Sequence, residues 1–497
     1  MPLATETDGP VFFPDEIPAR RCVLNRLKDI VLVLSDQHNG RYTGLAGGGM
    51  TDTPCLDQLA QSSTVFSAAY CNAPLCVPSR SSFLTGRLPH EIGIFDNDAL
   101  LPEDMPTIAH AMTAAGYDTV LAGRMHFKGH DQNHGFARRL TGDITTQYWG
   151  VARTDLGDFA GSLQASGCRK VAGYGISPTQ EYDDAVVQSA VELLRQPRSK
   201  PLFLVVGLYA PHFPFVCPEE DFRDSIDPEE PLDDASWPCH PCYDSLVQPV
   251  EPRQLRTIRA AYRGMVRQLD RRIGELHREF RRSSTDGIFI YTSDHGEQLG
   301  KRGLYGKKTL YEDSVRIPMI WEDGSRQSQV ISREVSLLDL NRTILDAAGA
   351  DLPQSRGVNL FSGQPSPVEI ETVTDDASAF LKSVILGGKK LTHYPNGNRV
   401  CDLASDEQEI GTPVTEGCDE LLACLPSPEE EAAILERQRL RMKGYPLLKA
   451  WGKQMQPRDT ARFPLSRECV TRPDPYRGQE LLDNARPHTQ EGAENNL

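Results

Sequence analysis

Residues 29–38, DIVLVLSDQH, decide the fold class of this 497-residue chain. The run IVLVL at 30–34 is apolar at every position, so both faces of the strand that it predicts must be buried. That pattern is typical of a central strand in a parallel sheet with layers on both sides. LFLVVGLYA at 202–210 is likewise apolar. GIFIYTS at 287–293 is apolar up to Tyr291 and, like the first run, is followed by polar residues.

Stretches with helical spacing separate these apolar runs. TPCLDQLAQSSTVFSAAY at 53–70 follows the first strand, and MPTIAHAMTAAGYDTVLAG at 105–123 predicts a helix ending near Gly116 and a strand through Val120. A helix over about 183–195 and the long amphipathic stretch 255–280 precede the other two runs. This alternation predicts an α/β fold with a mostly parallel sheet covered by helices on both faces.

The sequence pattern changes near residue 370, from alternating helices and strands to short strands joined by turns. FLKSVILGGKKLTHYPNGNRVCDL at 380–403 reads as short hairpins, and its Pro-Asn-Gly marks a tight turn. We expect four parts: an N-terminal extension over 1–27, a main α/β domain over 28–369, a smaller antiparallel C-terminal subdomain over 370–410, and a partly helical C-terminal extension over 411–497 whose tail is disordered.

Composition argues against several classes of partner. Lys and Arg number 53 against 69 Asp and Glu, a net charge of −16, which disfavours nucleic acid or an anionic membrane as the main partner. Residues 1–21 lack the basic start and unbroken apolar run of a signal peptide, and the apolar runs are too short to cross a bilayer. The sequence therefore predicts a soluble, cytoplasmic protein and leaves a homo-oligomer open.

Twelve cysteines are scattered along the chain, which does not suggest a disulfide framework in a long cytosolic protein. Cys239 and Cys242 form the one CxxC pattern, and it lacks a second pair at zinc-ribbon spacing. We interpret it as a loop with two thiols, with metal binding or redox cycling as the alternative.

Polar donors follow two of the predicted strands. Asp36 and Gln37 end the first strand, and Asp294 and His295 end the strand near Tyr291. Sites in open α/β sheets lie beyond the carboxyl ends of the strands, so these four side chains are expected to converge. Carboxylate, amide and imidazole donors suit calcium, magnesium or manganese. The alternative is that the two aspartates only cap the segments that follow them.

A third stretch, NAPLCVPSRSSFLTGRLPH at 72–90, carries Cys76 just before a helix that Pro78 favours. An anionic group at a helix N-terminus is stabilised by free N–H donors, and Arg80 lies four residues on over the same face. The local pattern favours an oxyanion site. A buried, inert thiol is the other interpretation of Cys76.

The residues around Cys76 and the strand-end motifs resemble those of a known enzyme family. Cys76-Val77-Pro78-Ser79-Arg80 resembles the Cys-x-Pro-Ser-Arg motif of the type I sulfatases, members of the alkaline-phosphatase-like superfamily. LSDQH (34–38), GRMHF (123–127), APHFPF (210–215) and TSDHGEQLGKRGLYGKK (292–308) follow in that family's order, and the similarity spans roughly residues 28–410. Within the family, the chain looks most similar to choline sulfatases and phosphonate monoester hydrolases.

The resemblance implies that Cys76 is oxidised to formylglycine by a formylglycine-generating enzyme. The hydrated aldehyde would attack a small organic sulfate, form a covalent sulfate ester, and release sulfate as its second hydroxyl collapses. One divalent metal, calcium or manganese, would be held by residue 76 together with Asp36, Gln37, Asp294 and His295.

Roles for the remaining positions are also implied by the resemblance. Arg80 would orient the diol, Arg124 and His126 would contact the sulfate group, and His126 would assist deprotonation of the diol. His212 and Lys307 would flank the leaving-group oxygen, where a proton must arrive. Asn97 would contact a substrate oxyanion.

Alternatives remain open at this point. The same site would suit a phosphonate monoester or phosphodiester, since sulfuryl and phosphoryl groups are of nearly equal size. A non-enzymatic anion-binding protein with unmodified Cys76 is a second alternative. A quaternary ammonium substrate would need an aromatic box, for which Tyr148 and Trp149 are candidates; ordinary packing is their other interpretation.

Overall fold

The computed structural model describes residues 27–129, 131–144, 167–324, 328–414 and 416–454. The expected N-terminal extension, apart from Leu27, and the expected disordered tail lie outside the described residues. So do Tyr148 and Trp149, the candidates for an aromatic box.

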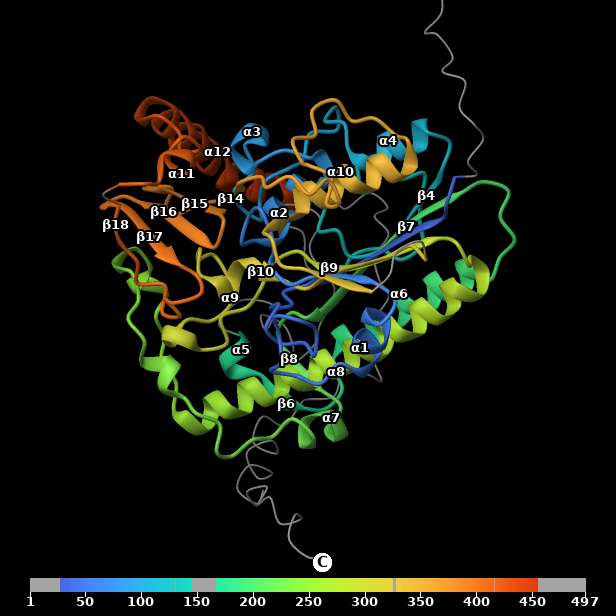
Figure 1. The fold of residues 1–497 in the computed structure, drawn as a ribbon, viewed down its shortest axis with the longest axis horizontal. Coiled ribbons are helices and arrows are strands. Elements are labelled where there is room, and N and C mark those ends of the chain that lie inside the picture. Colours follow the sequence, from blue (N-terminus) through green and yellow to red (C-terminus); the bar gives the residue numbers. More distant parts are fainter. Residues whose placement is uncertain (1–26, 130, 145–166, 325–327, 415, 455–497) are drawn as a thin grey trace, which may run out of the picture.

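An eight-stranded sheet forms the centre of the molecule (Figure 1). Strand β1 pairs in parallel with β7 and β9, and β7 pairs in parallel with β4. Only β11 runs antiparallel to its neighbours β2 and β9, so the predicted mostly parallel sheet is confirmed. In spatial order the strands are β12 (Gln329–Ile331), β2 (Thr64–Phe66), β11 (Met319–Glu322), β9 (Ile288–Ser293), β1 (Ile30–Asp36), β7 (Leu202–Pro211), β4 (Asp118–Gly123) and β5 (Arg138–Arg139).

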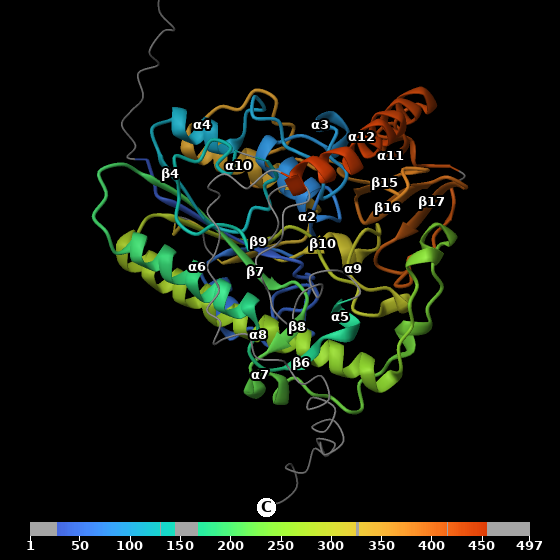
Figure 2. The ribbon, with the colours of Figure 1, turned by 180° about the vertical axis from the view of Figure 1, so that it is seen from behind.

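Helices cover both faces of this sheet (Figures 1 and 2). Along β1, Ile30, Leu32 and Leu34 join the core under α2, α4 and α10, whereas Val31 and Val33 join the core under α1, α6 and α8. Alternate side chains of a strand point to opposite faces, so an unbroken apolar run supplies two cores at once.

The helices are α1 (Pro54–Ala60), α2 (Cys76–Thr85), α3 (Pro89–Ile92), α4 (Ile108–Ala114), α5 (Gly167–Lys170), α6 (Pro178–Leu194), α7 (Glu219–Arg223), α8 (Pro252–Ser283), α9 (Glu312–Val315), α10 (Leu337–Ala348), α11 (Asp419–Leu422) and α12 (Pro428–Gln454). Short 3-10 turns are η2 (Asp233–Ser236), η3 (Pro241–Leu246) and η4 (Lys301–Gly303).

Two helices depart from the sequence-based expectation. The helical pattern over 53–70 forms a helix only to Ala60; the rest becomes β2 and the short strand β3 (Ala69–Tyr70). Ser62 and Ser63 follow the helix and donate to Leu59 O, and Thr64-Val65-Phe66 has the β-branched and aromatic side chains that strands favour. Helix α6 begins at Pro178 rather than near 183, because Ser177 caps it with a bond from the Gln180 N–H.

Smaller sheets lie beside the main one. Strand β3 pairs with β10 (Arg316–Ile317) and β13 (Val335–Ser336), and β6 (Ala172–Tyr174) pairs with β8 (Phe215–Cys217). A five-stranded antiparallel sheet lies at the left of Figure 1, with α12 beside it. Its strands are β14 (Val368–Val373), β15 (Phe380–Leu386), β16 (Lys389–Tyr394), β17 (Gly397–Asp402) and β18 (Thr412–Pro413). The predicted Pro-Asn-Gly turn joins β16 to β17.

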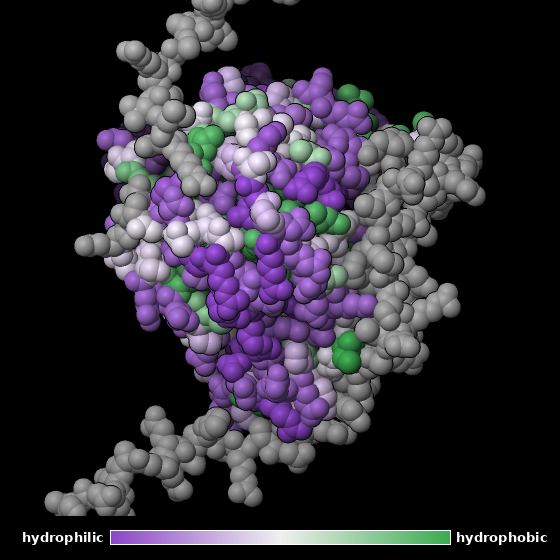
Figure 3. All heavy atoms as spheres, turned by 90° about the vertical axis from the view of Figure 1, so that its right-hand side faces the viewer, coloured by the Kyte–Doolittle hydropathy of each residue, from purple (hydrophilic) through white to green (hydrophobic). Residues whose placement is uncertain are grey.

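The surface seen from the right of Figure 1 is mostly hydrophilic, with hydrophobic residues in small, scattered groups (Figure 3). Among the described residues, no helix has the length and hydrophobicity that a membrane span requires.

Candidate active site

Strands β1 and β9 end side by side, and backbone contacts lock their ends together. Ser35 pairs with Ser293, so the residues that follow each strand leave the sheet at the same edge. The Asp294 N–H donates to Ser35 O at 3.2 Å, and the Gln37 N–H donates to Asp294 Oδ1 at 3.0 Å. Gln37 has a φ of 72°, a left-handed turn that ends the strand directly after Asp36.

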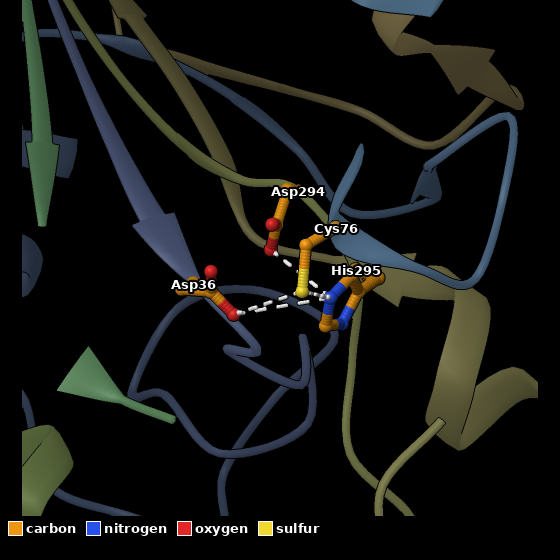
Figure 4. Close-up of side chains that lie close together, drawn as sticks. All are labelled: Asp36, Cys76, Asp294 and His295. Atoms are coloured by element: carbon orange, nitrogen blue, oxygen red, sulfur yellow. Dashed lines mark hydrogen bonds and ion pairs between the residues drawn. The ribbon is translucent and has the colours of Figure 1, made fainter. Parts of the chain in front are cut away.

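Four buried donors meet at this edge: Asp36, Cys76, Asp294 and His295. One ligand atom from each lies within 4.8 Å of the others, and all four side chains point toward one another (Figure 4). His295 Nε2 lies 3.3 Å from Cys76 Sγ, 3.6 Å from Asp294 Oδ1 and 3.9 Å from Asp36 Oδ1. The structure thus brings together three of the four predicted strand-end donors with the predicted cysteine.

The cluster is suited to a cation. His295 Nδ1 donates to Gly296 O at 3.0 Å, which leaves Nε2 to face the cluster with its lone pair. Burial lowers the pKa of His295, but Asp294 and Cys76 together outweigh burial, and the pKa is raised. Two carboxylates and an imidazole around one point therefore favour positive charge, and these donors suit calcium or manganese.

Gln37, predicted as a fourth ligand, has its side chain engaged beside the cluster. Its Oε1 accepts a hydrogen bond from Lys307, and its Nε2 donates to Glu297. The structure thus places Gln37 between the donor cluster and Lys307.

Two buried arginines hold the aspartates. Arg80 donates from Nε to Asp294 Oδ2 at 2.8 Å and from Nη2 to Asp36 Oδ2 at 3.1 Å. Arg124 donates from Nε to the same oxygen of Asp36 at 2.5 Å, and its Nη1 lies 3.5 Å from Asp143 Oδ1. Both arginines are 1% exposed, so these contacts are shielded from solvent.

The charges around Asp36 keep it ionised. Burial raises the pKa of Asp36, but the charges of Arg124, Arg80 and Lys307 outweigh burial and hold the pKa well below its usual value. An ionised, buried Asp36 is a strong ligand for a cation at pH 7.

His126 lies beside Arg124 in a constrained loop. Its φ is 61°, its N–H donates to Asp143 Oδ2 at 2.8 Å, and its Nδ1 accepts from Arg124 Nη2 at 3.1 Å. Burial and the charge of Arg124 lower the pKa of His126 well below its ordinary value, so the ring is neutral at pH 7. A neutral ring that accepts at Nδ1 carries its hydrogen on Nε2.

His212 follows β7 and faces the cluster. Its Nδ1 donates to Phe213 O at 2.8 Å, and its Nε2 lies 4.0 Å from Asp36 Oδ1. Burial and the charge of Lys307 lower the pKa of His212 well below its ordinary value. Lys307 Nζ lies 5.1 Å from the centre of the ring of Phe213, the residue that follows His212.

Asn97 contacts the helix that carries Cys76. Its Oδ1 accepts from the Val77 N–H at 3.0 Å, whereas Leu75, at the cap position, has no capping side chain. Asn97 therefore satisfies one free donor at the start of α2. The predicted contact between Asn97 and a substrate oxyanion stays a prediction.

Comparison with known proteins adds family information to this geometry. Residues 28–350 match the family model described as Sulfatase. The chain is 30% identical over 421 residues to a choline-sulfatase of Rhizobium meliloti, covering 77% of this chain and 81% of that protein. It is 28% identical over 438 residues to arylsulfatase K of Xenopus laevis, and the match covers 78% of this chain and 79% of that protein.

The chain belongs to the sulfatase family. It is therefore a hydrolase of sulfate esters. Among solved structures, the phosphonate monoester hydrolase of Agrobacterium radiobacter aligns with a TM-score of 0.66 at 19% identity, over 83% of this chain and 96% of that one. A phosphonate monoester hydrolase from Silicibacter pomeroyi aligns with a TM-score of 0.62 at 21% identity, over 85% of this chain and 96% of that one. These two likenesses show the shared fold, and the predicted α/β class is confirmed.

Two residues of this sulfatase were missed by sequence reasoning. Glu297 accepts from the N–H groups of Leu299 at 3.0 Å and Gly306 at 2.7 Å, and it also binds Gln37, so it fixes the loop before Lys307. Asp143 binds Arg124 and His126. Glu297 lies three residues after Asp294 in the strand-end motif, a weak signal; no local pattern marks Asp143.

The CxxC pair lies apart from the four-donor cluster. Cys242 lies in η3 and Cys239 lies before it; both are free thiols, and burial raises their pKa values to about 12 and about 11. All ten cysteines that the structure describes are free, which agrees with the expectation of no disulfide framework.

Proposed function

We propose that this sulfatase hydrolyses small organic sulfate monoesters with a formylglycine made from Cys76. The position of residue 76 carries the proposal: it is the first residue of α2, it is 0% exposed, and its Sγ lies 3.8 Å from Asp36 Oδ1. A hydrated aldehyde there has two hydroxyls, one to attack and one to collapse, whereas a thiol has a single nucleophilic atom.

Asp36, Asp294 and His295 would hold one divalent cation, calcium or manganese. Gln37 is proposed as a fourth ligand, because an amide oxygen has two lone pairs and can keep its contact with Lys307. When bound, the cation would polarise the sulfuryl group and offset the negative charge that gathers around residue 76.

In the first step, one hydroxyl of hydrated residue 76 attacks sulfur, and the bond from sulfur to the ester oxygen breaks. The attacking hydroxyl gives its proton to the unprotonated Nε2 of His212, and the departing alcohol gains one from Lys307, so sulfate stays esterified to residue 76. Lys307 is the proposed proton donor, because the hydrogen on His212 Nδ1 is held by Phe213 O. The lowered pKa of His212 leaves its Nε2 unprotonated.

In the second step, the remaining hydroxyl gives its proton to Lys307, which regains the charge lost in the first step. The carbonyl re-forms, the bond from carbon to the sulfate oxygen breaks, and His212 releases its proton to solvent. Sulfate leaves and water adds back to the aldehyde. Because His126 accepts from Arg124 at Nδ1, its Nε2–H is placed to donate to sulfate. Arg80 donates to both aspartates and so keeps the charged groups around residue 76 in place.

The test uses full-length protein matured with a formylglycine-generating enzyme. We expect faster hydrolysis of 4-nitrophenyl sulfate than of a 4-nitrophenyl phosphonate monoester, and no hydrolysis by Cys76→Ala. Cys55→Ala, which removes a thiol on α1, is the matched control and should retain activity. A preference for the phosphonate would reverse the substrate assignment, and an active Cys76→Ala would exclude residue 76 as the nucleophile. No hydrolysis of either ester by the matured wild type would overturn the proposed function in favour of the anion-binding interpretation.

A further inference from the structure

A cavity of about 220 Å³ adjoins the proposed leaving-group position. Lys307 and Phe213 line it, and Phe213 follows His212, whose ring centre lies 4.1 Å from that of Phe213. In the proposed reaction Lys307 and His212 flank the departing oxygen, so the alcohol part of the substrate extends into the cavity that Lys307 lines. The inference below rests on that proposed function.

The cavity wall combines apolar surface with cations. Phe213, Leu246, Leu304 and Tyr305 supply the apolar and aromatic part. Three cationic side chains, Arg169, Lys307 and Lys308, and one carboxylate, Asp375, supply the charge. A pocket of this size suits a small ring or short chain, with charged groups deciding its orientation.

The charges of the wall do not cancel. Asp375 is bound by Lys308 at 2.5 Å, so this pair is neutral, and Lys307 binds the uncharged amide of Gln37. Arg169 lies on α5, whose position is fixed by a 2.6 Å bond from Gln254 Nε2 to Arg169 O. Among the residues that the structure describes, the half-buried Arg169 guanidinium has no hydrogen-bond or ion-pair partner.

An arginine that is half-buried without an anion points to a missing partner, because guanidinium binds planar oxyanions through two parallel hydrogen bonds. We propose that the alcohol of the substrate is a small apolar or aromatic unit carrying a carboxylate, which Arg169 binds. A quaternary ammonium alcohol would instead bring its charge beside two uncompensated cations, Arg169 and Lys307, where like charges repel.

The test compares two esters of the same shape, 4-carboxyphenyl sulfate and its neutral amide 4-carbamoylphenyl sulfate. We expect wild-type kcat/KM to favour the carboxylate by about tenfold, the effect of one charged hydrogen bond. Arg169→Gln should remove this preference and leave kcat/KM for the amide nearly unchanged. Asp375→Asn should act in the opposite direction and increase the preference, because it frees Lys308.

The control is Arg278→Gln on the exposed face of α8, which should leave the preference as it is. Equal turnover of both esters by the wild type, or an unchanged preference in Arg169→Gln, would overturn this inference while leaving sulfatase activity intact. Loss of turnover with every sulfate ester would overturn the proposed function, and this inference with it.

Discussion

Asp36 is the residue at which the charges of the site meet. Arg124 and Arg80 share its Oδ2, and His212 and His295 approach its Oδ1. Because Asp36 and both arginines are almost completely buried, each charge depends on the others for compensation.

Removing Arg124 should therefore be costly. We expect Arg124→Met to abolish hydrolysis and to lower the free energy of unfolding by about 3–5 kcal/mol, because it leaves Asp36 and Asp143 poorly compensated. Arg138→Met is the control, since Arg138 pairs with Asp118 at 46% side-chain exposure and should cost about 1 kcal/mol or less. Urea unfolding of both variants in chelator measures the difference. Equal stability of the two variants would contradict this account of Asp36.

The proposed proton donation by Lys307 can be tested by comparing esters whose leaving groups differ in their need for a proton. If Lys307 gives the departing alcohol its proton, Lys307→Met should lower kcat/KM at least about tenfold more for an alkyl sulfate than for 4-nitrophenyl sulfate, whose phenolate leaves without a proton. His212→Gln should show a smaller difference between the two esters. An equal loss for both esters in Lys307→Met would assign Lys307 to binding instead.

Residue-level prediction succeeded where a side chain follows a buried strand. Asp36, Asp294 and His295 could be placed together because the ends of neighbouring parallel strands share one edge. Asp143 and Glu297 could not be assigned, because their roles come from contacts with backbone groups and side chains distant in sequence, and such contacts have no periodicity.

At the scale of elements, the segment from β9 to α9 is held by one buried carboxylate. Asp313, in the first turn of α9, faces Lys301 at 3.2 Å and Arg302 and Arg41 at 3.9 Å. Burial raises the pKa of Asp313, but Arg41 and Lys301 outweigh it and lower the pKa to about 2.

This depressed pKa predicts a pH dependence of stability. The contribution of ionised Asp313 is present above the unfolded-state pKa near 4 and is lost as the pH falls through about 2. We expect Asp313→Asn to cost about 2 kcal/mol at pH 7 and about 1 kcal/mol less at pH 3, measured by urea unfolding. An equal cost at both pH values would show that the charge of Asp313 adds no stability.

Elements were predictable where apolar patterns are long. Strand β1 and helix α8 lie where the sequence indicates, because each has an apolar pattern that fits only one kind of structure. Helix α1 ended early because residues 64–66 pair with β11 and β12, and this tertiary pairing overrides a weak local pattern.

At the scale of the whole molecule, α12 braces the active-site helix from far along the sequence. Tyr445 OH donates to Asp96 at 2.9 Å, and Gln438 Nε2 donates to the same carboxylate at 2.5 Å. Asn97, the next residue, binds the N–H of Val77 in α2. The C-terminal helix thus supports the segment that holds the start of α2.

Loss of the Tyr445 hydroxyl should weaken this support. We expect Tyr445→Phe to lower the free energy of unfolding by about 1–2 kcal/mol, because a buried hydrogen bond to a carboxylate is lost. Lys449→Met, which removes the exposed pair with Asp98, should cost less than about 1 kcal/mol. Chemical unfolding compares the two; a larger loss in Lys449→Met would place the main support of α12 at its exposed end.

The central claim is that the aldehyde made from Cys76 performs the hydrolysis. It is tested by measuring the fraction of protein in which Cys76 has been converted to formylglycine. Preparations matured to different extents can be digested, and mass spectrometry of the peptide around residue 76 gives the fraction converted to formylglycine. We expect sulfatase activity to rise in proportion to this fraction and to extrapolate to zero for the pure thiol. Full activity in protein whose Cys76 is entirely unmodified would contradict it.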